Sequence, residues 1–216
     1  MIILIGGEKG GPGKTTIATN LAAMRTKEVK DLLLIDTDKQ PTASYWCSIR
    51  EDNQIQPRVA SVQKFEKTVR TETLALKEKY NDIIIDAGGR DSPELRGALL
   101  VADKAIFPLR PSQFDLWTLG RLNTLVETAN EINENLKAYV LINQALPNPV
   151  VKEAEEAKQL VSDFENLILM ETHICERIVF RRAAIQGMSV VEYKPEDYKA
   201  TEEINNLYKE IFDEQE

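Results

Sequence analysis

KGGPGKTT, at residues 9–16, is the stretch that decides the fold of this chain. It follows the apolar run IILI at residues 2–5, which is typical of a buried strand, and it precedes good helix formers at residues 17–24. A strand, a glycine-rich turn and a helix in this order are the context that a phosphate-binding loop requires. Glycines let several backbone N–H groups turn toward one point, and the helix N-terminus adds a partial positive charge.

Two side chains of this stretch suit a nucleotide with bound magnesium. Lys14 can reach the β- and γ-phosphates, and the Thr15 hydroxyl can ligate Mg²⁺. The expected cradle for the nucleotide consists of Gly10, Gly11, Gly13, Lys14, Thr15 and Thr16.

Pro12 departs from what a phosphate loop favours, because proline has no backbone N–H. In phosphate loops generally, the N–H at this position is among those aimed at the β-phosphate. Losing one donor to a charged acceptor costs on the order of 1–3 kcal/mol. The sequence leaves open whether the loop binds a nucleotide tightly or weakly.

Lys9 makes the motif more specific. The general phosphate-loop pattern would have a glycine nearby at position 8, where this chain has Glu8. The arrangement resembles the deviant Walker A motif of the ParA/MinD family of ATPases, in which the early lysine crosses a dimer interface and touches the partner's phosphates. The resemblance implies ATP and Mg²⁺ as cofactors, a catalytic Lys9, an ATP-dependent sandwich homodimer and a slow ATPase as the monomer. A solvated lysine at the start of a loop is the alternative.

Carboxylates follow two further apolar runs. The segment DTDKQ at residues 36–40 resembles the D-x-D-x-Q switch I of ParA proteins, in which proline is usual at the position of Lys39. That resemblance implies that Asp36 helps to hold the Mg²⁺ shell and that Asp38 orients the attacking water. Asp86 resembles the Walker B aspartate, another metal ligand, and residues 88–89 resemble a mobile switch II.

Asn143 follows the apolar run at residues 139–142. In relatives of MinD, an asparagine at a similar place hydrogen-bonds the adenine, so the resemblance implies a nucleotide-binding role. An ordinary turn asparagine is equally compatible with the sequence.

Five apolar runs recur along the chain with helical segments between them. The runs are residues 2–5, 32–35, 83–85, 105–107 and 139–142, and the predicted helices are 15–26, 62–79, 92–101, 115–134, 151–163 and 199–213. Unalternating apolar runs are typical of parallel strands covered on both faces. We therefore predict an α/β fold with a doubly wound, mostly parallel sheet, forming a single P-loop ATPase domain over residues 1–216.

A basic stretch lies near the end of the chain. Arg177, Arg181 and Arg182 fall on adjacent faces of a helical turn, although the net charge of the chain is −8. The stretch resembles the ParA segment whose basic residues contact DNA phosphates without reading sequence once two subunits have paired. A solvated arginine face or internal salt bridges are the alternatives. The helix beyond residue 200 is apolar on one face and acidic on the other, so we expect it to pack on the domain or to bind a partner.

Composition fits a soluble globular protein, with 43% hydrophobic and 29% charged residues and no apolar run long enough to span a membrane. We expect a cytoplasmic, nucleoid-associated protein without a membrane partner. The resemblance implies a ParA-type partition ATPase that binds DNA non-specifically and segregates a plasmid or chromosome with a ParB-like or ParG-like centromere-binding protein. The alternatives are a ParA-like ATPase positioning a protein compartment or conjugation complex, a MinD-like regulator, and a dethiobiotin-synthetase-like ligase.

Overall fold

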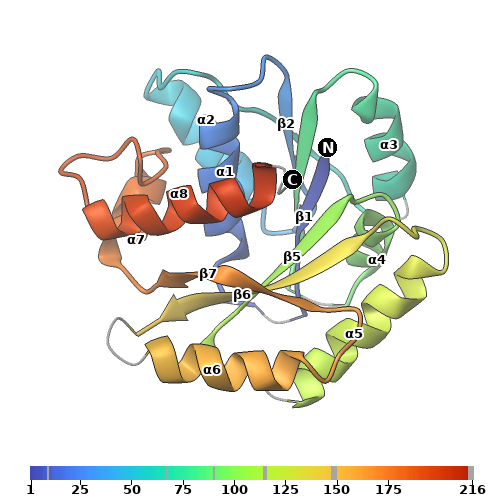
Figure 1. The fold of residues 1–216 in the computed structure, drawn as a ribbon. Helices are drawn as coiled ribbons and strands as arrows, with labels where there is room; N and C mark the ends of the chain where they lie inside the picture. Colours follow the sequence, from blue (N-terminus) through green and yellow to red (C-terminus); the bar gives the residue numbers. More distant parts are fainter. Residues whose placement is uncertain (9, 67, 90, 114–115, 147–149, 214–216) are drawn as a thin grey trace.

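The computed structural model describes residues 1–8, 10–66, 68–89, 91–113, 116–146 and 150–213 (Figure 1). Within these ranges, seven strands form one sheet in the order β3-β2-β4-β1-β5-β6-β7, and every neighbouring pair is parallel. The strands are β1 (Ile2–Ile5), β2 (Leu32–Asp36), β3 (Ala60–Gln63), β4 (Asp82–Asp86), β5 (Lys104–Leu109), β6 (Lys137–Ala145) and β7 (Ile168–Cys175). The predicted α/β class with a doubly wound sheet is confirmed, and its described strands are parallel throughout.

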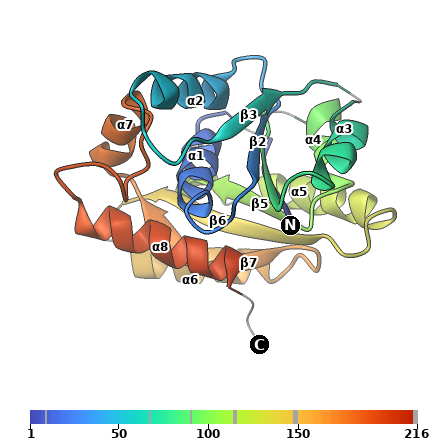
Figure 2. The ribbon, with the colours of Figure 1, turned by 90° about the horizontal axis from the view of Figure 1, so that it is seen from above.

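Helices cover both faces of the sheet (Figure 2). One face carries α1 (Lys14–Arg25), α2 (Thr42–Asp52), α7 (Ile178–Ile185) and α8 (Tyr198–Phe212). The other face carries α3 (Thr68–Lys77), α4 (Pro93–Leu99), α5 (Leu116–Asn130) and α6 (Val150–Val161), and a short 3₁₀ turn, η1 (Pro111–Gln113), follows β5. No helix of the described residues is both long and apolar enough to cross a membrane.

The apolar runs form strands because alternate side chains enter two different cores. In β1, Ile3 and Ile5 belong to the core beneath α1 and α8, whereas Ile2 and Leu4 belong to the core beneath α4 and α5. A strand that is buried on both faces needs an apolar residue at every position, which is what the first run provides.

Three parts of the secondary-structure prediction were wrong or incomplete. The helix predicted for residues 62–79 begins only at Thr68, and β3 occupies residues 60–63 in front of it. Strand β7 and helix α2 were not predicted at all. Both missed strands lie at the edges of the sheet and are only partly buried, so neither has a continuous apolar run to mark it.

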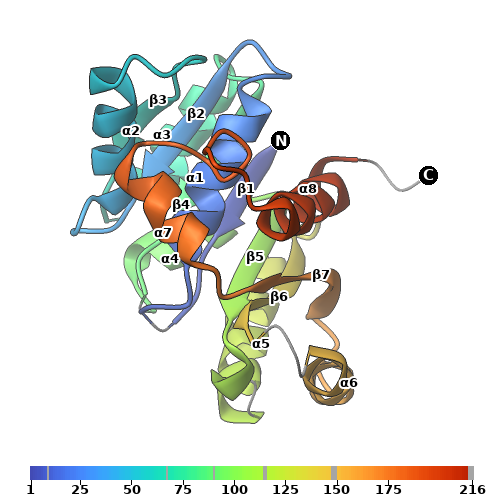
Figure 3. The ribbon, with the colours of Figure 1, turned by 90° about the vertical axis from the view of Figure 1, so that its left-hand side faces the viewer.

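Helix α8 packs against the edge strand β7, as Figure 3 shows. Its apolar residues, including Ile204, are buried in the core, so the expectation that this helix packs on the domain is confirmed. Its acidic residues also serve the edge strand. The Glu210 carboxylate accepts hydrogen bonds from the backbone N–H groups of Glu171 (2.8 Å) and Thr172 (3.0 Å). These bonds occupy backbone donors that an edge strand would otherwise leave unpaired.

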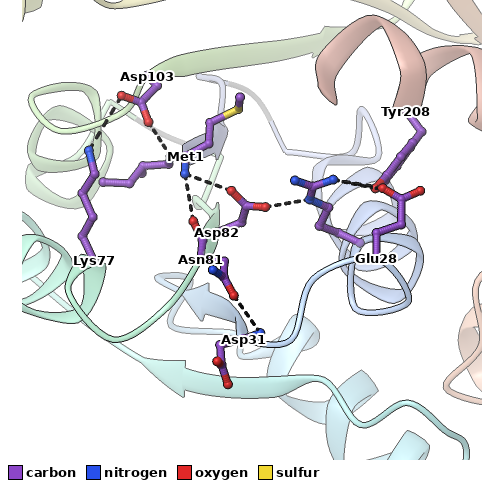
Figure 4. A network of polar contacts seen from close by, with 10 residues as sticks. Met1, Glu28, Asp31, Lys77, Asn81, Asp82, Asp103 and Tyr208 are labelled. Carbon is purple, nitrogen blue, oxygen red and sulfur yellow. Dashed lines mark hydrogen bonds and ion pairs between the residues drawn. The ribbon is translucent and has the colours of Figure 1, made fainter. Parts of the chain in front are cut away.

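A polar network closes the amino ends of the strands, away from the glycine-rich loop (Figure 4). The Asp82 carboxylate accepts hydrogen bonds from the α-amino group of Met1 (2.9 Å) and from Arg25 Nε (2.6 Å). Arg25 also contacts Glu28, which accepts a hydrogen bond from the Tyr208 hydroxyl (2.6 Å). The network therefore ties β1 and β4 to the ends of α1 and α8.

Candidate nucleotide and metal site

The carboxyl ends of three neighbouring strands meet in register. Ile5 at the end of β1 is paired with Asp86 at the end of β4, and Asp86 is paired with Asp36 at the end of β2. The glycine-rich loop leaves β1 at this point and ends at Gly13, which caps α1 with a φ of 85°. A Cβ at Gly13 would lie 2.6 Å from Asn143 Nδ2, so both its backbone conformation and its surroundings require glycine.

Thr15 and Asp86 connect the start of α1 to the end of β4. The Thr15 hydroxyl donates a hydrogen bond to Asp86 Oδ2 over 2.7 Å, and the buried Asp86 Oδ1 has no hydrogen-bond partner among the described residues. Burial is the main cause that raises the pKa of Asp86 to about 7; the Thr15 hydrogen bond opposes this shift, and the negative charge of Asp36 adds to it. A buried carboxylate with one unsatisfied oxygen is a group that a bound cation would stabilise.

Asp36 and Asp38 shape the loop that follows β2. The two oxygens of Asp36 accept hydrogen bonds from the backbone N–H groups of Asp38 (3.1 Å) and Ser44 (2.9 Å). Burial raises the pKa of Asp36, and these two amides partly offset the shift. A Cβ at Gly88 would lie 3.3 Å from Asp38 Oδ2, so the predicted switch I and switch II segments lie against each other.

Lys14 is buried at the first position of α1. Burial lowers the pKa of its ammonium group, and the charges of Asp86 and Asp38 counteract that shift. The two carboxylates therefore lie close enough to affect the protonation of Lys14. A Mg²⁺–nucleotide site requires this combination, because an ammonium group binds the phosphates and neighbouring carboxylates bind the metal.

The donor set fits Mg²⁺ that is held largely by water and phosphate. Within the described ranges, no group of three or more histidine, cysteine or acidic side chains is arranged to enclose a metal. Mg²⁺ usually keeps several waters and takes only one or two protein carboxylates together with substrate phosphates. The Thr15 hydroxyl and the unsatisfied oxygen of Asp86 match that pattern.

Asn143 lies at the carboxyl end of β6 and is buried. Its Nδ2 donates a hydrogen bond of 2.5 Å to the carbonyl oxygen of Pro12. The Asn143 side chain, which was predicted to bind the nucleotide, thus reaches the glycine-rich loop. The carbonyl group of Pro12 accepts a hydrogen bond from its amide nitrogen.

Sequence reasoning missed Arg110, which also reaches this loop, and Gln144, which contacts Arg110. Arg110, directly after β5, donates from Nη2 to the Gly11 carbonyl oxygen (3.1 Å) and from Nε to Gln144 Oε1. Both residues follow a strand-like run, a position at which polar side chains of parallel sheets gather. Their position after such a run is the feature of the sequence from which they could have been predicted.

A small pocket of about 70 Å³ continues from the loop toward α7. Its lining includes Gly13, Thr16 and Asn143 from the loop side and Phe180 and Arg181 from α7.

The three arginines of the basic stretch have different surroundings. Arg177 Nη2 lies 2.5 Å from Glu203 Oε1 of α8, and both side chains are about 15% exposed. The hydrogen bond to Glu203 raises the pKa of Arg177. Arg181 and Arg182 are exposed on α7. The salt-bridge alternative therefore describes Arg177, and the two other arginines keep exposed cations.

Lys9, on which the predicted dimer depends, lies outside the described residues.

Comparison with known proteins agrees with this geometry. The chain is 28% identical over 208 residues to the "Maintenance of carboxysome distribution protein A" of Halothiobacillus neapolitanus. The alignment covers 94% of this chain and 92% of that protein. It is 24% identical over 220 residues to the "Chromosome-partitioning ATPase Soj" of Thermus thermophilus, covering 89% and 88%.

Solved structures share the fold. The septum site-determining protein MinD of Pyrococcus horikoshii, complexed with Mg-ADP, superposes with a TM-score of 0.73 and 18% identity over 98% of this chain and 96% of that chain. The model of the "CobQ/CobB/MinD/ParA nucleotide binding domain" matches residues 3–190. This match spans most of the chain and includes the loop, both carboxylate strand ends and Asn143. The chain therefore belongs to the CobQ/CobB/MinD/ParA nucleotide-binding domain family.

Proposed function

We propose that this protein is a Mg²⁺-dependent ATPase that positions a cargo inside the cell, acting as one domain over residues 1–216. The observation that carries the ATPase proposal is the Thr15–Asp86 hydrogen bond of 2.7 Å beside the unsatisfied Asp86 Oδ1. This contact joins the phosphate-loop helix to the second carboxylate strand at the point where a nucleotide's metal would lie.

Each residue of the site has its own role in the proposed reaction. Thr15, Asp36 and Asp86 would hold Mg²⁺, and bound Mg²⁺·ATP supplies a phosphoryl group that water can attack. Lys14 and the loop N–H groups stabilise the charge on the phosphate oxygens. Asp38 orients the attacking water from the loop after β2, and Lys9 of a second copy completes the charge stabilisation.

A large protein assembly is the cargo that the relatives favour. The chain matches a carboxysome distribution protein over nearly its full length, at higher identity than it matches the partitioning ATPase Soj. A cargo of this kind needs an ATPase whose attachment to a surface changes with the bound nucleotide. The exposed Arg181 and Arg182 support DNA as that surface.

DNA partition is the second candidate, because the Soj relative is a chromosome-partitioning ATPase. In that case the cargo is a plasmid or chromosome and the partner is a ParB-like or ParG-like centromere-binding protein. The ATPase cycle is the same in both cases, so the two candidates differ in the partner that stimulates hydrolysis.

The proposal is tested by the oligomeric state in the presence of nucleotide. We expect ATP and Mg²⁺ to convert the wild-type monomer into a dimer, as measured by multi-angle light scattering. Lys9→Ala should abolish the conversion while the monomer still binds ADP, since the loop of each monomer is unchanged. Unchanged dimerisation of Lys9→Ala would refute the sandwich dimer, and absence of any ATP binding by the wild type would refute the ATPase.

A further inference from the structure

Two successive carbonyl groups of the glycine-rich loop are held by side chains from neighbouring strands. The Gly11 carbonyl oxygen accepts a hydrogen bond from Arg110 Nη2 (3.1 Å), and the Pro12 carbonyl oxygen accepts one from Asn143 Nδ2 (2.5 Å). The donors come from the ends of β5 and β6, so the loop that leaves β1 is fastened to the next two strands of the sheet.

The Arg110 side chain is itself fixed in place. Its Nε donates a hydrogen bond to Gln144 Oε1, and Gln144 directly follows Asn143 on β6. Two donors of one planar guanidinium group therefore engage two different partners, which restricts the orientation of the group although the residue is exposed. Gln144 has a φ of 57°, an uncommon conformation for a residue other than glycine.

We propose that Arg110, oriented by Gln144, is a positioning residue that prepares the phosphate loop for its nucleotide. This inference rests on the proposed function and extends it to a residue outside the loop motif. A guanidinium is always charged, so the contact with Gly11 is a charge-assisted hydrogen bond.

The physical reason lies in the charges of the loop. Carbonyl oxygens carry partial negative charge and repel phosphates, whereas the N–H groups attract them. Donors from Arg110 and Asn143 compensate two of these oxygens, and the guanidinium adds a full positive charge beside the loop. Such support matters for this loop because Pro12 leaves it with one N–H donor fewer than a loop without proline would have.

The order of the loop can be measured without any nucleotide. We expect Arg110→Met to accelerate amide hydrogen exchange in the peptides that cover residues 10–16 of the nucleotide-free protein. Arg58→Met is the matched control, since Arg58 is an exposed arginine whose ion pair with Glu51 is remote from the loop. Unchanged exchange in Arg110→Met would overturn the proposal, whatever the protein does with ATP.

Affinity for ADP gives the second measurement, by calorimetry. Losing a charge-assisted hydrogen bond should weaken ADP binding about tenfold in Arg110→Met. Gln144→Leu should show part of the same loss, and the double variant should lose less than the sum of the two, because the residues act as a unit. Additive losses, or equal affinity in all variants, would contradict the positioning role.

The outcomes separate the two proposals. If the wild type does not bind ADP, the proposed ATPase fails, and the exchange experiment still decides whether Arg110 orders the loop. If Arg110→Met does not fold, Gln144→Leu provides the same exchange and affinity measurements while the guanidinium stays in place. Thermal melting of each variant shows whether a change in exchange is confined to the loop.

Discussion

At the scale of single residues, the site combines groups that are unfavourable to bury. Lys14, Asp36 and Asp86 are all buried. Burial lowers the pKa of Lys14 and raises the pKa of both aspartates, so it favours the uncharged form of each group. Buried charges are destabilising unless they are paired and hydrogen-bonded. A ligand that carries phosphates and a cation would place opposite charges beside these groups, so it should stabilise the folded state by mass action.

Thr15→Val tests the metal contribution of a single residue. Valine keeps the shape of threonine and removes the hydroxyl that contacts Asp86 Oδ2. We expect affinity for ADP to fall at least about tenfold when Mg²⁺ is present, and by less than about twofold in EDTA, because the Thr15 hydroxyl can act as a metal ligand only when Mg²⁺ is bound. Calorimetry under both conditions measures the difference. Equal Mg²⁺ dependence in the two proteins would exclude Thr15 from the metal site.

At the scale of elements, helix α2 connects the site to the segment after α7. The Ser44 N–H near the start of α2 donates to Asp36. Near the other end, Arg50 is 1% exposed and donates to the Gly187 carbonyl oxygen (3.0 Å) and to both oxygens of Glu192 (2.8 Å each). A Cβ at Gly187 would lie 2.5 Å from the backbone nitrogen of Arg50, so the segment after α7 fits closely against α2.

The Arg50–Glu192 pair gives a prediction about pH. Burial by itself would raise the pKa of Glu192, but the Arg50 guanidinium and the Ser189 N–H outweigh it and hold the pKa below its ordinary value of 4.5, with a smaller contribution from Lys27. A carboxylate with a depressed pKa stabilises the fold fully above its unfolded pKa. That contribution is lost as the pH falls through the lower folded pKa.

We therefore expect Glu192→Gln to lower the free energy of unfolding by about 3 kcal/mol at neutral pH, because it leaves a buried guanidinium without its counter-charge. The difference from the wild type should shrink as the pH falls from 4.5, the ordinary pKa of a glutamate, through the lower pKa of Glu192 in the folded protein, because the wild-type carboxylate then becomes protonated as well. Urea unfolding at neutral pH and at about pH 3 measures both values. Glu51→Gln, in an exposed pair, is the control. A difference that does not change with pH would contradict this account.

At the scale of the whole molecule, a net charge of −8 opposes binding to DNA except where cations gather. Arg177 is paired with Glu203, so Arg181 and Arg182 are the cations of the predicted patch that remain exposed. One subunit then offers few phosphate contacts, and pairing of two subunits would double them. This is the physical reason to expect DNA binding only in the ATP-bound dimer.

Replacing both Arg181 and Arg182 with glutamate should abolish ATP-dependent binding to random-sequence duplex DNA and leave dimerisation intact. Wild-type binding should fall steeply between two salt concentrations, because each phosphate contact releases a counterion. An electrophoretic shift with and without ATP measures both effects. Since Arg181 also lines the pocket beside the loop, Arg182→Glu alone serves as the variant that avoids it. Undiminished binding by the double variant would place the DNA surface elsewhere.

The sequence by itself determined the centre of the sheet and the site that lies there. Residues 2–5, 32–35 and 83–85 are continuous apolar runs that end at the glycine-rich loop or at an aspartate, so strand, turn chemistry and site coincide within a few residues. The register of Ile5, Asp36 and Asp86 follows once three such strands are parallel neighbours. A local sequence pattern is enough to predict a strand where burial on both faces requires an apolar residue at every position.

Only the tertiary structure decided which strands form the edges of the sheet and which side chains contact one another. Strands β3 and β7 lack a full apolar run because one side of each is open, and β7 is completed by Glu203 and Glu210 of α8. The same helix neutralises Arg177, and Arg110 reaches a loop 99 residues away in sequence. Such contacts depend on which elements pack together, and no local spacing encodes them.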